Sequence, residues 1–182
     1  MARTKREQAP EEKRDEIVAA ARALFVEEGF EATSISRLAA AAGVAPNTIY
    51  WYFRDKDEVL VAVLDAEFSS SMAEYLQLAL KDLSGRLLWV VSRLEQVSRL
   101  VSTVHSRLQT SAAINSWHDR FHALSESMVR QELLHTGVAP EAVDARVKIA
   151  VFSIEGLLSH QLPEAQQRAI CEVLAAPWHP DR

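Results

Sequence analysis

The sequence predicts an all-α protein, with an N-terminal head of three short helices and a larger C-terminal helical body. Only five glycines and six prolines occur among 182 residues, so few positions favour the turns of a strand-rich protein. Hydrophobic residues make up 48% of the chain, and several long segments carry them at helical spacing. Together these observations favour helices packed on one another around a substantial core.

The first expected helix covers residues 11–28, after a flexible basic tail over residues 1–10. Its apolar stripe includes Ile17, Ala21 and Leu24, and Gly29 ends it. On this basis we expect a head over residues 11–71 and a helical body over residues 72–182.

Two short helices around a tight turn are expected over residues 34–53. The first helix is marked by apolar residues that repeat at i, i+3, i+4 and i+7, starting at Ile35. Ser34 can cap its N-terminus, Gly43 suits the left-handed position after it, and Pro46 suits the first turn of the second helix. Asp55-x-x-Glu58 has the spacing of a helix start related to a capping box, and the helix that follows is expected to link head and body.

The order of residues from Gly29 to Lys56 resembles the DNA-binding domain of the tetracycline-repressor (TetR) family. The matching positions are Gly29, Thr33, Ser34, Leu38, Ala39, Ala42, Gly43, Val44, Thr48, Ile49, Tyr50, Trp51, Tyr52, Phe53 and Lys56. Ala45 stands where the family usually has Ser, which removes a hydroxyl cap worth about 1 kcal/mol. Asn47 stands where a small residue is frequent. The match covers about the first third of the chain.

This resemblance implies a sequence-specific DNA-binding transcriptional regulator, with repression as the expected mode and a palindromic operator in double-stranded DNA. The second helix of the motif would enter the major groove. Phosphate contacts are expected from Thr33, Ser34, Tyr52 and Lys56, and base contacts from Asn47, Thr48 and Trp51. We expect Ile49, Tyr50 and Phe53 to face the core. Successive helical residues lie about 100° apart, so the three aromatics from Tyr50 to Tyr52 cannot share one buried face.

The formal net charge of −5 is unusual for a DNA-binding protein, but the distribution of charge matters more than its sum. The N-terminal tail is basic, and Arg37, Arg54 and Lys56 lie within the motif. Acidic residues of the body can lie beyond a Debye length of about 8–10 Å from the duplex. We expect transient contact between the tail and DNA, although a tail with no contact fits the same composition.

The body is expected to contain one long helix over residues 87–109 and further helices over 113–135, 140–161 and 163–176. The segment 147–158 is apolar on more than one face, so it needs two partners to bury it. One would be its own core, and the other a second copy of the chain. The family resemblance implies a four-helix dimer bundle here, with the expected interface residues Val147, Val151, Ile154 and Leu158. A central helix buried in a monomer is the alternative.

The resemblance also implies an effector pocket in the body, suited to a small apolar or aromatic molecule. The candidate pocket residues are Trp89, His105, Trp117, Phe121 and Phe152. A change in the helix from Asp55 would then pass the effector's signal to the head. Two other hypotheses stay open: a DNA-binding regulator without a small effector, and a helical ligand-binding protein or enzyme with a vestigial head.

Several other sites are not expected. His118 and His122 could bind a metal ion from one helical face, but the sequence offers no third ligand, and the Glu132-x-x-His135 motif occurs once. Cys171 has no partner for an intramolecular disulfide. No nucleophile or phosphate-loop motif is present, and neither a signal region nor a bilayer-spanning apolar run is evident. We therefore expect a cytoplasmic protein that is not an enzyme and needs no cofactor or metal.

Overall fold

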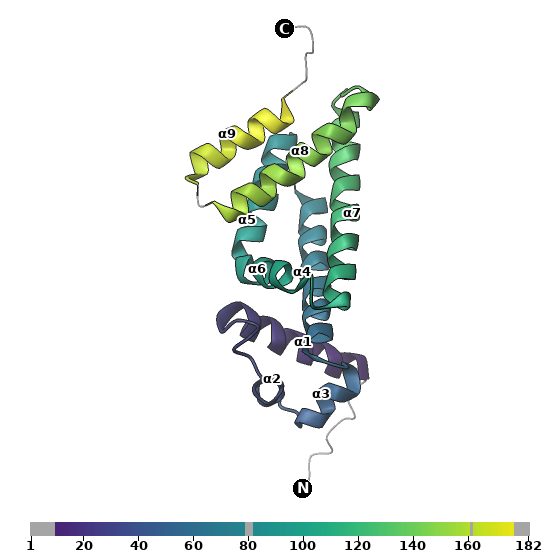
Figure 1. The fold of residues 1–182 in the computed structure, drawn as a ribbon, viewed down its shortest axis with the longest axis vertical. Helices are drawn as coiled ribbons and strands as arrows, with labels where there is room; N and C mark the ends of the chain where they lie inside the picture. The colour runs from purple at the N-terminus through teal and green to yellow at the C-terminus, as the bar shows by residue number, and fades with distance from the viewer. Residues whose placement is uncertain (1–9, 79–81, 161, 177–182) are drawn as a thin grey trace. The chain divides into compact units, whose positions relative to one another are not determined.

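A computed structural model describes residues 10–78, 82–160 and 162–176, and within these ranges the chain forms nine α-helices and no strand (Figure 1). The helices are α1 (Pro10–Glu27), α2 (Ile35–Ala41), α3 (Pro46–Tyr52), α4 (Lys56–Gln77), α5 (Leu83–Gln96), α6 (Ser98–Arg107), α7 (Ala112–His135), α8 (Pro140–Ser159) and α9 (Glu164–Ala175). The predicted all-α fold is confirmed. None of the described helices combines the length and the hydropathy needed to span a bilayer.

The helices are divided between two compact units. The first unit contains the described residues up to Ser70 together with Arg99–Asn115, and the second contains Ser71–Ser98 together with the described residues from Ser116 onward. The division falls inside α4, and α6 belongs with the N-terminal helices rather than with α5. The DNA-binding motif is therefore part of a unit built from two separate stretches of chain.

The core of the first unit is formed by apolar residues of α1, α2, α3, α4 and α6. Its fully buried large side chains include Ile17, Phe25, Leu38, Ile49, Val59, Leu60, Val63 and Leu100. The rings of Phe25 and Phe30 meet edge to face, with centroids 5.2 Å apart. This packing holds the loop after α1 against the core.

The turn between α2 and α3 forms as the local sequence predicts. Ser34 caps α2, because its Oγ accepts a hydrogen bond from the Arg37 backbone N–H at 3.1 Å. Gly43 follows the helix with φ +65°, a conformation that L side chains adopt at a cost. The N–H of Val44 donates to Ala39 O and that of Gly43 to Ala40 O, which is the Schellman pattern.

The start of α4 is also capped as predicted. Asp55 Oδ1 accepts from the Glu58 N–H at 2.9 Å, and Glu58 Oε2 accepts from the Arg54 N–H at 2.7 Å. The reciprocal pattern is that of a capping box, displaced by one residue toward Arg54. The hydrogen bonds that the Glu58 carboxylate accepts lower its pKa, with the Arg54 backbone N–H as the main cause and the Arg54 side chain next.

The prediction of one long helix over residues 87–109 is wrong, because the helix is interrupted at Val97. There φ is −115° and ψ is +26°, and the Val97 N–H turns back to Leu94 O at 3.1 Å. The segment before the break buries Leu87 and Val91 in the second unit, whereas the segment after it buries Leu100 and Val104 in the first. The apolar residues of α5 and those of α6 thus pack into different cores.

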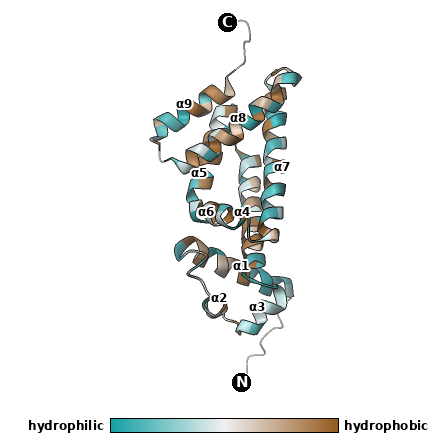
Figure 2. Cartoon of the chain, in the orientation of Figure 1, coloured by the Kyte–Doolittle hydropathy of each residue, from teal (hydrophilic) through white to brown (hydrophobic). Residues whose placement is uncertain are grey.

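The core of the second unit lies where α5 packs against both α8 and α9. Its buried cluster contains Leu83, Leu87, Val91, Leu133, Val138, Val143, Val147, Leu157 and Cys171. The buried Gln167 amide donates to Glu95 Oε1 at 2.7 Å and so links α9 to α5. Burial raises the pKa of the Cys171 thiol, which disfavours its reactive thiolate form. Hydrophobic residues are concentrated along the middle of α8 (Figure 2).

Candidate nucleic-acid interface

The helix α3 is anchored on one side and presents large aromatic side chains on the other. Ile49 is fully buried, whereas Tyr50 is 55% exposed and Trp51 is 73% exposed. Asn47 is also exposed near the start of the helix. Burying the apolar side of such a short helix fixes its direction, so the opposite face can present a defined set of side chains to a ligand.

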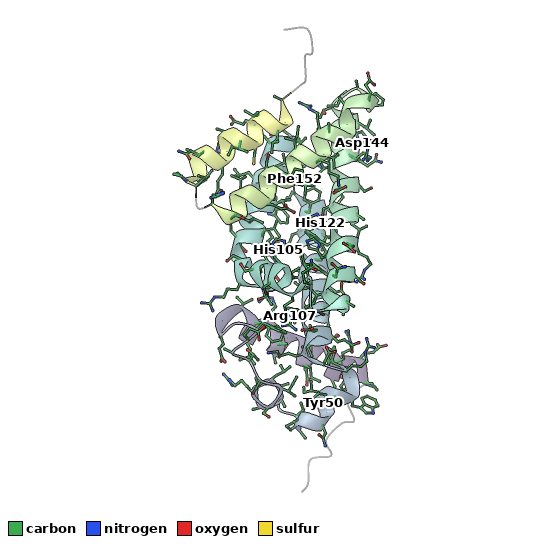
Figure 3. All side chains as sticks on the ribbon, viewed as in Figure 1. Tyr50, His105, Arg107, His122, Asp144 and Phe152 are labelled. Carbon is green, nitrogen blue, oxygen red and sulfur yellow. The ribbon has the colours of Figure 1, made fainter. Side chains whose placement is uncertain are left out.

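The placement of Tyr50 differs from the sequence-based expectation. The sequence predicts that Tyr50 packs inside the motif, yet its side chain projects from α3 away from the core (Figure 3). The reason is geometric: Ile49 and Phe53 are four residues apart and share one face, whereas Tyr50 lies about 100° around the helix. Tyr50 is therefore an aromatic of the exposed face that the sequence analysis missed.

Tyr52 is half-buried and supports the exposed indole. The rings of Trp51 and Tyr52 meet nearly at right angles, with centroids 4.8 Å apart. Tyr52 also contacts Phe53, with centroids 6.5 Å apart, and Phe53 is buried. This chain of aromatic contacts connects Trp51 to the core of the unit.

Thr33 cannot contact phosphate through its side chain in this structure, contrary to expectation. Its relative exposure is 0%, and its Oγ1 donates to Gly29 O at 2.8 Å. Its backbone N–H donates to Phe30 O at 3.2 Å. Both donors of Thr33 therefore fix the loop after α1, and the residue has a structural role.

Lys56 also binds this loop. Its Nζ donates to Phe30 O at 2.8 Å and to Thr33 O at 3.1 Å, and it lies 4.1 Å from the centre of the Phe30 ring. An ammonium group has three N–H donors, so two of them are used within the protein. The geometry makes Lys56 a clamp between α4 and the loop, and a phosphate contact by its third donor stays a prediction.

Exposed polar and basic groups surround α3. Ser34 is exposed at the start of α2, although its Oγ already caps that helix. Arg37 is exposed on α2 and forms an ion pair with Glu28, whose hydrogen bond raises the pKa of the guanidinium. Arg14 on α1 lies over the Phe53 ring at 5.2 Å. The basic residues of the tail at positions 3, 5 and 6 lie outside the described residues.

The helix α6 is fastened to the same unit by two arginines. Arg99 donates to the carbonyls of Val26, at 3.3 Å, and Glu27 at the end of α1. Arg107 pairs with Asp57 on α4, with an Nε–Oδ1 distance of 2.9 Å (Figure 3 labels Arg107). Carbonyls at a helix C-terminus and a carboxylate are both favourable partners for a cation. These contacts join α6 to the end of α1 and to the start of α4.

Of the five predicted pocket residues, Trp117 and Phe121 contact each other, and a pocket formed by all five stays a prediction. Trp117 and Phe121 stack on α7 with centroids 5.3 Å apart, and Trp89 contacts Tyr75 at 5.9 Å. Phe152 is 67% exposed, and its assignment to the pocket stays a prediction. His105 is exposed on α6 and belongs to the first unit.

Only one of the four predicted interface residues is fully buried within its own chain, and the interface itself stays a prediction. Val147 is buried in the core of its own unit, and Ile154 packs against that core. Val151 and Leu158 are half-buried. The large apolar residues that α8 leaves exposed are Ile149 and Phe152, on a different face from the one expected.

A tight glycine turn between two helices, an anchored short second helix and an exposed aromatic face define a helix-turn-helix DNA-binding protein. Residues 17–63 match the family described as "Bacterial regulatory proteins, tetR family". Over 173 residues, the chain is 32% identical to the HTH-type transcriptional regulator SrpR of Pseudomonas putida, covering 87% of this chain and 79% of that protein. It is also 27% identical over 170 residues to the transcriptional repressor KstR of Rhodococcus jostii, covering 93% of this chain and 71% of KstR.

A solved TetR transcription regulator from Haloarcula marismortui superposes with a TM-score of 0.74 over 91% of this chain and 97% of that one, at 16% identity. At that identity the likeness shows the fold alone. The chain belongs to the TetR family and is a DNA-binding transcriptional regulator. The resemblance drawn from the motif residues is confirmed, and so is the expectation that the chain is not an enzyme.

Proposed function

We propose that this regulator is a homodimeric repressor that binds a palindromic operator and leaves it when a small molecule binds the second unit. The observation that carries the DNA-binding part is the exposure of Tyr50 and Trp51 on a helix whose opposite side is anchored by Ile49. Large amphipathic rings on a fixed helix offer a partner a large contact area, and their dimensions suit a major groove.

Within the interface, Asn47, Thr48, Tyr50 and Trp51 approach the base edges. An Asn amide can pair with adenine, and apolar surface of Thr or Trp can pack on a thymine methyl group. Ser34 and Tyr52, with their hydroxyl groups, contact phosphates, and Arg37 adds a guanidinium on the neighbouring helix. Phosphate contacts set the register of the protein on the duplex, and the α3 side chains select the sequence.

Dimerisation is supported by the apolar side chains that α8 and α9 leave exposed. Ile149 and Phe152 on α8 and Val173 on α9 have exposed fractions between 54% and 73%. Ile149, Phe152 and Gly156 are spaced by three and four residues, so they follow one stripe of α8. One recognition helix reads only a few base pairs, whereas a twofold pair places two helices about 34–36 Å apart in successive major grooves.

The effector is a small apolar or aromatic molecule that binds the second unit. The stacked, half-buried rings of Trp117 and Phe121 supply the kind of flat apolar surface that such a ligand needs. The ligand acts by preferring a conformation that fits the operator poorly, since equal affinity for both conformations would shift nothing.

The operator proposal is tested with DNA from upstream of the protein's own gene. Fluorescence anisotropy and footprinting on the full chain should find a protected palindrome with two half-sites. Scrambling one half-site should weaken binding by more than tenfold, whereas scrambling the spacer sequence at constant length should have little effect. Binding that is indifferent to every duplex at low ionic strength would overturn the proposal.

The effector proposal is tested separately. A panel of small aromatic and apolar compounds is screened for an increase in the melting temperature of the protein, and each stabilising compound is then added to the preformed operator complex. At least one compound should release the DNA. Stabilising compounds that leave the operator affinity unchanged would contradict ligand control while leaving DNA binding intact.

A further inference from the structure

Two histidines of α7 direct the same ring atom toward one another. His118 and His122 are four residues apart, their Nε2 atoms are 3.0 Å apart, and their ring centroids are 4.3 Å apart. Both side chains are half-buried. One ring donates to the other in this arrangement, so the two nitrogens occupy a single small region of space.

This separation matches two ligands of one metal ion. With metal–nitrogen distances of about 2.0–2.1 Å, nitrogens 3.0 Å apart subtend roughly 90–95° at the metal. An angle near 90° suits adjacent positions in a square-planar or octahedral ion, whereas a tetrahedral Zn²⁺ site needs the nitrogens farther apart. Imidazole donors in such a geometry favour Cu²⁺ or Ni²⁺, and the general order of stability favours Cu²⁺.

A carboxylate from the neighbouring helix lies close to the pair. Glu155 on α8 places Oε1 3.6 Å from His122 Nε2 (Figure 3 labels His122). No three such side chains already surround a common point in the described ranges, so Glu155 must rotate to complete a site. Its side chain is 40% exposed, which leaves it room to do so.

We propose that His118, His122 and Glu155 bind one divalent transition-metal ion, Cu²⁺ in preference to Ni²⁺ and Zn²⁺, and so link α7 to α8. The two imidazoles ligate through Nε2, and the ring that now donates moves its proton to Nδ1. Water fills the remaining positions. The sequence shows the histidine pair but not Glu155, because only folding brings α8 beside α7. The three ligands are separate from the residues proposed to contact DNA, but they adjoin the proposed effector surface, because the rings of Phe121 and His122 meet edge to face with centroids 5.6 Å apart.

The test is a titration of the full-length, metal-free protein with Cu²⁺ in a weakly competing glycine buffer. One tightly bound Cu²⁺ per chain is expected, with a visible d–d band and an electron paramagnetic resonance spectrum that shows two nitrogen ligands. His118→Ala and His122→Ala should each weaken binding by at least about tenfold, the loss known even for residues outside the ligand shell. The double variant His135→Ala/His160→Ala removes two other described histidines and should bind Cu²⁺ as the wild type does.

Each result supports or overturns the proposal. Glu155→Gln should weaken Cu²⁺ binding and alter the resonance spectrum, and an unchanged spectrum would remove Glu155 from the site. Equal affinity of the wild type and His118→Ala would overturn the site altogether. Far-UV circular dichroism checks that each variant stays helical. Should His118→Ala fail to fold, His118→Gln keeps the test available, because it preserves bulk but lacks the imidazole.

Discussion

Arg107 on α6 forms a bidentate ion pair with Asp57 at the start of α4, through two parallel hydrogen bonds. Nε lies 2.9 Å from Oδ1, and Nη2 lies 3.0 Å from Oδ2. The same guanidinium contacts Glu31 at 3.1 Å and lies 4.9 Å from the centre of the Phe30 ring. The hydrogen bond to Asp57 raises the pKa of Arg107. A two-pronged pair of this kind is strong and directional, and it joins three segments of the first unit.

Replacing this arginine should weaken the unit. Arg107→Met keeps much of the side-chain bulk but removes the donors to Asp57 and Glu31, so we expect the free energy of unfolding to fall by about 1.5–3 kcal/mol. Urea denaturation followed by circular dichroism measures the change. Arg168→Met is the matched control, because Arg168 pairs with Glu164 on an exposed surface, where such pairs are worth about 0.3–0.5 kcal/mol. Equal losses in both variants would contradict the role of Arg107.

Lys56→Met should also destabilise the protein. The substitution leaves the carbonyls of Phe30 and Thr33 without their donor, and we expect a loss of about 1–3 kcal/mol in the free energy of unfolding. Lys148→Met, which removes an exposed partner of Glu126, serves as the control and should change stability by less than about 1 kcal/mol. The slope of log K against log salt for operator binding then shows whether Lys56 also contacts phosphate. A slope reduced by about one indicates that contact.

Two substitutions distinguish a residue proposed to contact DNA, Trp51, from a residue that supports the motif, Thr33. Trp51→Ala should weaken operator binding by about 5- to 150-fold, the equivalent of 1–3 kcal/mol, while the melting temperature stays close to that of the wild type. Thr33→Val should leave operator affinity nearly unchanged, because the Thr33 hydroxyl is buried and bound to Gly29 O. Anisotropy titrations measure both affinities. The reverse pattern, with Thr33 sensitive and Trp51 silent, would contradict the assignment of this face.

The local signals of the motif are readable from sequence because each depends on neighbouring residues alone. Ser34 as a cap, Gly43 as a left-handed residue and the Asp55–Glu58 pair are all predicted and all form. The break at Val97 is not readable, since no proline or glycine marks it. It arises because the residues on either side of it join different cores, which is a property of the tertiary structure.

The faces of helices are harder to predict than their limits. From the sequence alone, Tyr50 could be assigned to the buried side of α3, but in the structure it is exposed. On α8, apolar residues occupy much of the helix circumference, so their spacing does not indicate which face is buried. Val147 lies in the core, whereas Ile149 and Phe152, which follow it on the same helix, are exposed. The packing of α8 in its unit, which includes its contacts with α5 and α9, decides between these faces.

A charge placed on the exposed stripe of α8 should prevent dimerisation. In Phe152→Glu, a carboxylate would have to be buried without a partner between two copies of the chain, which costs several kcal/mol. Sedimentation equilibrium should show a dimer for the wild type and a monomer for the variant. Leu124→Glu alters an exposed apolar residue of α7 and should remain dimeric. A dimer that survives Phe152→Glu would place the interface elsewhere.

The capped start of α4 should contribute to the acid sensitivity of the protein. The folded-state pKa of Glu58 is lowered, so its stabilising effect is present above its ordinary pKa near 4.5 and is lost as the pH falls through the folded value. The stability difference between the wild type and Glu58→Gln should therefore be greatest near pH 6 and should shrink toward pH 3. Denaturant midpoints across this range measure it. Glu12→Gln, at an exposed position of α1, is the control, and a constant difference for Glu58→Gln would contradict the cap.

Because α6 shares a core with the N-terminal helices, the DNA-binding unit of this regulator is not one continuous stretch of sequence that can be moved to another protein. A chimera joined after α4 would omit Arg99 and Arg107 together with the buried Leu100 and Val104. It would expose apolar surface and leave the end of α1 without its cationic cap. Engineers who exchange operator specificity between relatives of this protein therefore need to graft α6 with the motif, or to re-create its contacts in the recipient.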